Sequence, residues 1–210
     1  MILHSRLRPS FLGTPFIGFI RRHVSTLVNN PHIYVFPSAT KNSHVLSLLA
    51  TDPPALSLSI GHTTAIPPTP ASFNENPRFL AILNDVLAAK AALDPALVAQ
   101  AAAFAQRSAG MVGRRGGAAR QPARGGWVHI SDERAAPDDG RRIAWPEDIF
   151  GSLEVDGQGH FVDGGRYQPS GTYRLVTPQG ILGLSPFLRA HLVAHLAHLA
   201  TQLPSPNASA

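Results

Sequence analysis

A segment rich in glycine and arginine, residues 109–126, divides the chain of 210 residues into two parts. It has six glycines and no acidic or aromatic residue, and its arginines are Arg114, Arg115, Arg120 and Arg124. Such a composition cannot bury enough apolar surface to offset the entropy lost on ordering, so we expect a long disordered loop.

The part that follows, residues 127–203, is short for an independent domain. At about 70–80 residues a single hydrophobic core contributes only a few kcal/mol, and the chain has no cysteine for disulfide bonds. We therefore expect 25–108 and 127–203 to share one core in an α+β domain, with 109–126 as an excluded loop and 204–210 as a tail. Two separate domains are the alternative.

The first 24 residues have the composition of a mitochondrial presequence. No acidic residue precedes Asp52, and the arginines within 1–24 are Arg6, Arg8, Arg21 and Arg22. Arginine, serine and apolar residues without acids are typical of such signals, and we expect cleavage near Ser25. The apolar run 11–20 is broken by glycine and proline, unlike a secretory signal, and no window approaches the roughly 20 apolar residues of a transmembrane helix.

Removal of residues 1–24 also changes what the net charge implies. The whole chain carries 18 basic and 13 acidic residues, a net charge of +5. The presequence takes four of the basic residues and none of the acids, which leaves the mature chain near +1. A case for nucleic-acid binding therefore rests on the 109–126 loop alone, whose arginines could grip an RNA backbone.

Apolar periodicity predicts the elements of the N-terminal part. We expect a strand over 33–36, a short helix over 43–49 and a strand over 56–60, with a parallel pair allowed by the connection. No regular structure is expected over 61–70. Two helices follow, from Pro77 and from Pro95 to about Arg107, and their spacing suggests an antiparallel hairpin.

The C-terminal part contains turns and short segments typical of a small antiparallel sheet. Ser185-Pro186 is a helix start signal, and we expect a last helix to about Leu203. The expected strands, a hairpin followed by a meander, are 153–156, 160–163, 172–177 and 181–184.

Three histidines on the last helix, His191, His195 and His198, fall on one narrow stripe at helical spacing. Histidines four residues apart on a helix can bind one metal ion, so zinc or iron is a candidate ligand here; no other cofactor is predicted. The glutamate of the zinc-protease motif is missing, because Leu192-Val193-Ala194 lie between the first two. The competing interpretation is that the histidines edge a buried leucine face.

Acidic and aromatic residues gather before the predicted meander. Trp145, Glu147, Asp148 and Phe150 form a loop that we expect to be anchored on the core by its two aromatics; if these were exposed, the loop would be a docking patch. The acids from Asp132 to Asp148 alternate with arginines and match no metal-binding loop, which favours solvated, self-neutralising loops. His62, after a predicted strand, is a weaker ligand candidate.

Catalytic motifs are absent from the sequence. There is no P-loop, no nucleophile elbow and no dinucleotide fingerprint, and zero cysteine excludes thiol chemistry. Our leading hypothesis is a non-enzymatic accessory or assembly factor of the mitochondrial matrix that contacts protein partners. The alternatives are an RNA- or ribosome-associated protein using the 109–126 loop, and a metal-binding protein or enzyme using the histidine stripe.

Two stretches of the C-terminal part resemble those of small, uncharacterised fungal mitochondrial proteins. They are Pro146-Glu147-Asp148-Ile149-Phe150-Gly151-Ser152-Leu153-Glu154-Val155-Asp156-Gly157 and Tyr167-Gln168-Pro169-Ser170-Gly171-Thr172-Tyr173-Arg174-Leu175-Val176-Thr177. The resemblance continues through residues 183–188 and includes 67–77. It implies a mitochondrial location and a fungal lineage, and no activity.

Overall fold

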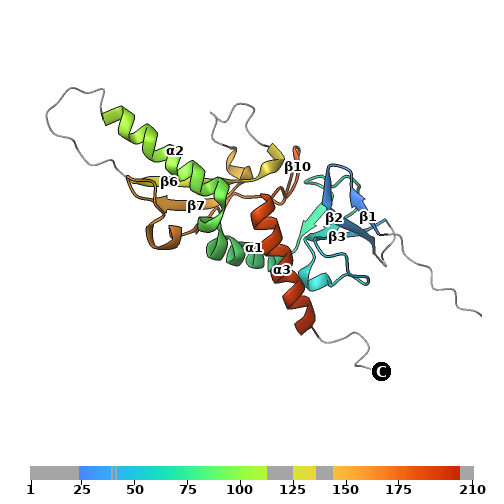
Figure 1. Cartoon of the computed structure of the whole chain (residues 1–210). Coiled ribbons are helices and arrows are strands. Elements are labelled where there is room, and N and C mark those ends of the chain that lie inside the picture. The colour runs from blue at the N-terminus through green and yellow to red at the C-terminus, as the bar shows by residue number, and fades with distance from the viewer. Residues whose placement is uncertain (1–23, 39, 41, 113–124, 136–143, 204–210) are drawn as a thin grey trace, which may run out of the picture.

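The computed structural model describes residues 24–203 except 39, 41, 113–124 and 136–143. Within these residues it has three α-helices and antiparallel sheets, so the predicted α+β class is confirmed. In Figure 1 a five-stranded sheet lies at one end and the β6–β7 sheet at the other, with α1 and α3 between them. The predicted presequence, the tail 204–210 and most of the predicted loop 109–126 lie outside the described residues.

The N-terminal sheet is wholly antiparallel and contains β1 (Ser25–Leu27), β2 (Asn30–Pro37), β3 (His44–Ser47), β4 (Gly61–Thr63) and β5 (Phe73–Glu75), in that order. The predicted helix 43–49 is therefore wrong, because its short apolar run forms the central strand β3, which pairs with both β2 and β4. A short apolar run does not distinguish a buried strand from a buried helix.

The predicted strand 56–60 and the predicted parallel pair are also wrong. The segment forms a 3₁₀ turn, η1 (Leu56–Leu58), and the hydroxyl of Ser59 donates to the carbonyl of Leu56 at 2.8 Å. Ser59 is fully buried beside buried Ile60, so burial does not alternate as the sequence does. This local hydrogen bond offers the backbone an alternative to a strand ladder.

Helix α1 (Pro77–Lys90) and helix α2 (Pro95–Val112) start where the sequence predicts. The Asn76 side chain accepts from the Arg78 N–H, and Asp94 Oδ1 accepts from the Ala96 N–H, so each helix has an N-cap. The helices do not form the expected antiparallel hairpin, because the chain turns by only 58° between them. The 3₁₀ turn η2 (Ala91–Leu93) joins the two helices, which pack on different elements: α1 on α3, and α2 on β6.

The C-terminal part forms a second antiparallel sheet from β6 (Gly126–Ser131), β7 (Ile149–Val155) and β8 (Gln168–Pro169). The predicted hairpin beyond β7 is reduced to a bridge between Val155 and Phe161, which leads into η5 (Val162–Gly165). Of the predicted strands 172–177 and 181–184, only the hairpin of β9 (Val176–Thr177) and β10 (Gly180–Ile181) forms. The remaining elements are η3 (Glu133–Ala135), η4 (Pro146–Asp148) and α3 (Pro186–Gln202).

Residues of both parts belong to one cluster of buried apolar side chains, which includes Ile33 and Phe79 from the first part and Leu153 and Leu192 from the second. Side-chain hydrogen bonds also join the two parts. The pairs are Asn30 with Leu182, Glu75 with Leu175, Asn84 with Tyr167, and Asp94 with Ser185. The two parts therefore form one structural unit in the described chain.

Candidate functional site

A buried arginine, Arg134 in η3, organises the C-terminal part. Its side chain is 3% exposed, and its Nε donates to Asp148 Oδ1 at 2.9 Å. Nη1 donates to the Leu175 carbonyl at 2.7 Å, and Nη2 donates to the carbonyls of Glu147 at 3.0 Å and Arg174 at 2.6 Å. One planar guanidinium thus holds a buried carboxylate and three backbone carbonyls.

Asp132 is a second buried carboxylate near this arginine, with its Oδ2 3.6 Å from Arg134 Nε. Its Oδ1 accepts from the backbone N–H groups of Arg134 at 2.9 Å and Gly183 at 2.8 Å, and its Oδ2 accepts from the Tyr173 hydroxyl at 2.9 Å. Burial raises the pKa of Asp132, although attraction to Arg134 and these hydrogen bonds partly offset the rise. Burial, together with the Asp132 charge, raises the pKa of the Tyr173 hydroxyl well above its usual value.

The prediction of solvated acidic loops is therefore wrong for Asp132 and Asp148, which are 1% and 0% exposed. A buried carboxylate needs a charged partner with satisfied hydrogen bonds, and Arg134 gives Asp148 that partner. Glu133 and Glu147 are exposed as expected. The other residues of the acidic stretch lie outside the described chain: Asp138, Asp139, Arg141 and Arg142.

Two adjacent cavities, which we call the Glu75–Arg174 cleft because both residues line both cavities, lie beside this cluster. The larger, of about 300 Å³, is also lined by Glu147 and by the apolar side chains Phe73, Val176 and Pro178. The smaller, of about 200 Å³, is lined by Asn84 and by buried apolar and aromatic residues: Leu83, Phe150 and Tyr173. The cleft joins β5 and α1 of the first part to segments of the second.

Backbone hydrogen bonds fix the charged residues of the cleft. The Arg174 N–H donates to the Glu147 carbonyl at 3.1 Å, and both residues offer their carbonyls to Arg134. The Leu175 N–H donates to Glu75 Oε1 at 3.0 Å. Among the ion pairs formed within the described residues, none includes Glu75, Glu147 or Arg174. The cleft therefore presents charged residues that have a fixed backbone and that do not form ion pairs with one another.

The loop predicted as an anchor or docking patch is divided between the surface and the interior. Trp145 is 63% exposed, so the predicted anchoring by this side chain is wrong, whereas Phe150 is 3% exposed and packs on Tyr173. Asp148 is also buried, which removes Asp148 and Phe150 from any docking patch. Trp145 and Glu147 remain at the surface; Glu147 lines the cleft, and Trp145 precedes it by two residues in the chain.

A second groove, of about 160 Å³, is apolar and lies at the turn between β1 and β2. Val28 at this turn is 98% exposed, and the groove is also lined by Ile66, Pro67 and Ile181. No charged side chain lines it. The Glu75–Arg174 cleft, in contrast, has charged groups on a fixed backbone that can make directional contacts.

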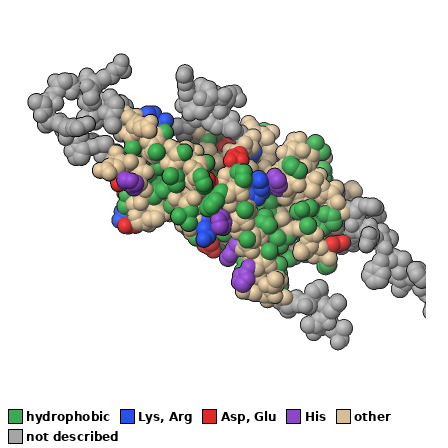
Figure 2. All heavy atoms as spheres, viewed as in Figure 1, with side chains coloured by type: hydrophobic (Ala, Val, Ile, Leu, Met, Phe, Trp, Pro, Cys, Tyr) green, Lys and Arg blue, Asp and Glu red, His purple; other side chains and the backbone are tan. Residues whose placement is uncertain are grey.

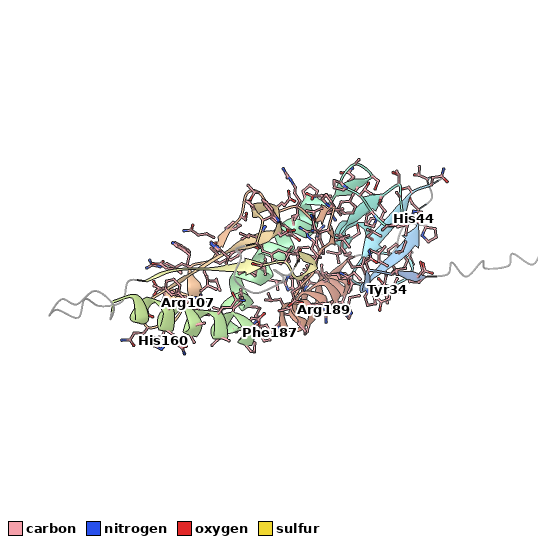
Figure 3. All side chains as sticks on the ribbon, turned by 90° about the horizontal axis from the view of Figure 1, so that it is seen from above. Tyr34, His44, Arg107, His160, Phe187 and Arg189 are labelled. Carbon is pink, nitrogen blue, oxygen red and sulfur yellow. The ribbon has the colours of Figure 1, made fainter. Side chains whose placement is uncertain are left out.

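The histidine stripe lies on the surface of α3. His195 and His198 are exposed, and half-buried His191 contacts Phe187, with ring centroids 4.5 Å apart. Figure 2 shows histidines on the face in view, and Figure 3 labels Phe187, which belongs to the first turn of α3. The stripe edges the face of buried Leu188, Leu192 and Leu196. Within the described residues no group of three metal-ligating side chains converges.

The remaining candidates take no part in the cleft. His62 lies on β4, paired with Val45 of β3 and Asn74 of β5, and not in the ligand loop expected after a strand. The RNA-contact candidates Arg114, Arg115, Arg120 and Arg124 lie outside the described residues, and RNA association stays a prediction. The prediction from sequence missed Glu75, Arg134 and Arg174 as a group, because the nearest two are 40 residues apart.

No protein-family model matches the chain, and no curated protein or solved structure matches it. Among the described helices, none is by itself long and apolar enough to cross a bilayer; the bent pair of 77–93 and 95–107 meets that test only jointly.

Proposed function

We propose that the protein is a non-enzymatic accessory or assembly factor of the mitochondrial matrix that binds a protein partner through Trp145 and the Glu75–Arg174 cleft. The observation that carries the proposal is the large, 63% exposed Trp145, two residues before Glu147, a charged residue of the cleft whose backbone carbonyl is held by Arg134. Tryptophan and arginine are the residues most often found at energetic hot spots of interfaces. A fixed backbone lowers the entropy lost on binding.

The compartment is supported by the N-terminal composition. The arginines of residues 1–24 and the lack of acids before Asp52 are typical of a matrix presequence. The first strand begins at Ser25, the expected cleavage point, so removal of the segment before it leaves every described strand and helix complete. The resemblance to fungal mitochondrial proteins supports the same compartment.

The proposal is tested by tagged full-length protein recovered from isolated mitochondria and size-fractionated. Trp145→Ala is compared with Trp127→Ala, since Trp127 on β6 is 41% exposed and lies on a different element. We expect the wild type and Trp127→Ala to elute as a complex with a defined partner, and Trp145→Ala to elute as a monomer. A wild-type protein that is strictly monomeric, or an unchanged complex with Trp145→Ala, would refute the proposal.

A further inference from the structure

We propose that the Glu75–Arg174 cleft receives an extended, basic peptide segment, with one lysine or arginine side chain held between Glu75 and Glu147. This inference rests on the proposed function and specifies the chemistry of the partner.

The charge of the cleft is negative, although the whole chain carries +5. Glu75 and Glu147 line the larger cavity against a single cation, Arg174. Beneath them, Arg134 is already engaged by a buried acid, Asp148. Two carboxylates against one guanidinium leave the cavity with one net negative charge, so the cleft favours a cation and disfavours the phosphates of RNA.

The free polar atoms favour a basic side chain carried on a peptide backbone. Glu75 uses only Oε1, for the Leu175 N–H, and the side chain of Glu147 accepts no hydrogen bond from the described residues. An ammonium or guanidinium group has the donors to bridge these two carboxylates. The exposed Arg174 is a neighbouring donor that can bind an acceptor on the same ligand, and a peptide carbonyl provides one.

The size and the walls of the larger cavity exclude a bulky element. About 300 Å³ accommodates a long side chain and its backbone, and not the diameter of a helix. Phe73, Val176 and Pro178 give apolar walls for the aliphatic stem of a lysine or arginine. An extended segment meets both requirements.

The test uses fluorescence anisotropy with the full chain and labelled synthetic peptides that differ only at a central residue: arginine, glutamine or glutamate. We expect the arginine peptide to bind about tenfold more tightly than the glutamine peptide, and the glutamate peptide to bind weakest. Glu147→Gln and Glu75→Gln should each remove most of this preference. Glutamine at position 75 keeps the oxygen that accepts from the Leu175 N–H, so the local fold is retained.

The matched control is Asp85→Asn, which removes one negative charge from an exposed position of α1 that does not line the cleft. This variant should bind the arginine peptide as the wild type does. The inference would be overturned if the three peptides bound equally, or if Asp85→Asn and Glu147→Gln had equal effects. It would also be overturned if a single-stranded RNA displaced the arginine peptide and this displacement depended on Glu75 and Glu147. If a partner complex depends on Trp145 but the protein shows no preference for the arginine peptide, this inference alone is refuted. If no such complex is found, the proposed function is refuted.

Discussion

Replacement of Arg134 by methionine should destabilise the protein severely. The side chain of Arg134 is 3% exposed and donates four hydrogen bonds, of which one goes to the fully buried carboxylate of Asp148. Asp148 Oδ2 has no hydrogen-bond partner in the described chain, so Arg134 supplies most of the stabilisation of this charge. Methionine fills a similar volume and supplies no donor.

The expected loss follows from these contacts. Removing one partner of a buried ion pair costs about 3–5 kcal/mol. The part-buried Leu175 carbonyl keeps the Leu182 N–H as a donor at 3.0 Å but loses Arg134, which costs about 1 kcal/mol more. Water can reach the carbonyls of Glu147 and Arg174, whose bonds to Arg134 are exposed. A total of about 4–6 kcal/mol is a large share of the stability of an ordinary domain, and it should lower the Tm by about 10–20 °C.

Urea unfolding, with the unfolding free energy extrapolated to water, measures this loss. Arg189→Met is the matched control, because within the described residues the Arg189 side chain makes a single hydrogen bond, of 3.3 Å, to the Leu184 carbonyl. The effect of Asp148→Asn on the unfolding free energy should change sign between the two backgrounds. It should destabilise the wild type, where Asp148 is paired, and stabilise Arg134→Met, where it removes the unpaired charge. A loss below about 1 kcal/mol for Arg134→Met, or the same sign for Asp148→Asn in both backgrounds, would refute the reasoning.

Three further predictions concern stability. Because burial raises the pKa of Asp132 above its ordinary 3.8, the folded state binds this proton more tightly than the unfolded state does. The resulting contribution to the free energy of unfolding is present at low pH and is lost as pH rises through the folded-state pKa. Asp132→Asn should remove this pH dependence from the unfolding free energy measured by urea titration. Identical pH profiles would contradict this. Asp94→Ala removes the cap of α2 and the acceptor of the Ser185 hydroxyl, which should cost about 1–2 kcal/mol by thermal unfolding, while an unchanged Tm would show the cap to be unimportant. Gly151→Ala should destabilise by about 1–3 kcal/mol, because a Cβ would lie 2.4 Å from the Gln168 carbonyl oxygen; a neutral effect in the same assay would mean that β8 moves freely.

Local signals in the sequence were sufficient for the helix starts. Asn76-Pro77, Asp94-Pro95 and Ser185-Pro186 each combine a capping side chain with a proline, and all three helices begin there. The direction of the chain between α1 and α2 was not predictable from such signals, because it depends on which surfaces the helices find: α3 for α1 and β6 for α2.

The cleft was not predictable because its parts come from distant segments. The acids near Arg134 looked solvated in sequence, since alternating charges are typical of a surface loop. Whether a charge is buried depends on the shape of its partner and on the backbone around it. Here Asp132, Asp148 and the carbonyl of Leu175 surround Arg134 from three segments, and no spacing in the sequence records that arrangement.

The hydrogen bonds that join the two parts of the chain determine when folding can finish. The Asn30 side chain donates its hydrogen bond to Leu182, 152 residues later, and Asp94 accepts a bond from Ser185, 91 residues later. A chain delivered N-terminus first, by a ribosome or through a membrane pore, cannot complete its core until almost all of it has emerged, because such non-local contacts form only after long loops close. Until then part of the core lacks its partners, so the full stability of the fold is reached only late in delivery.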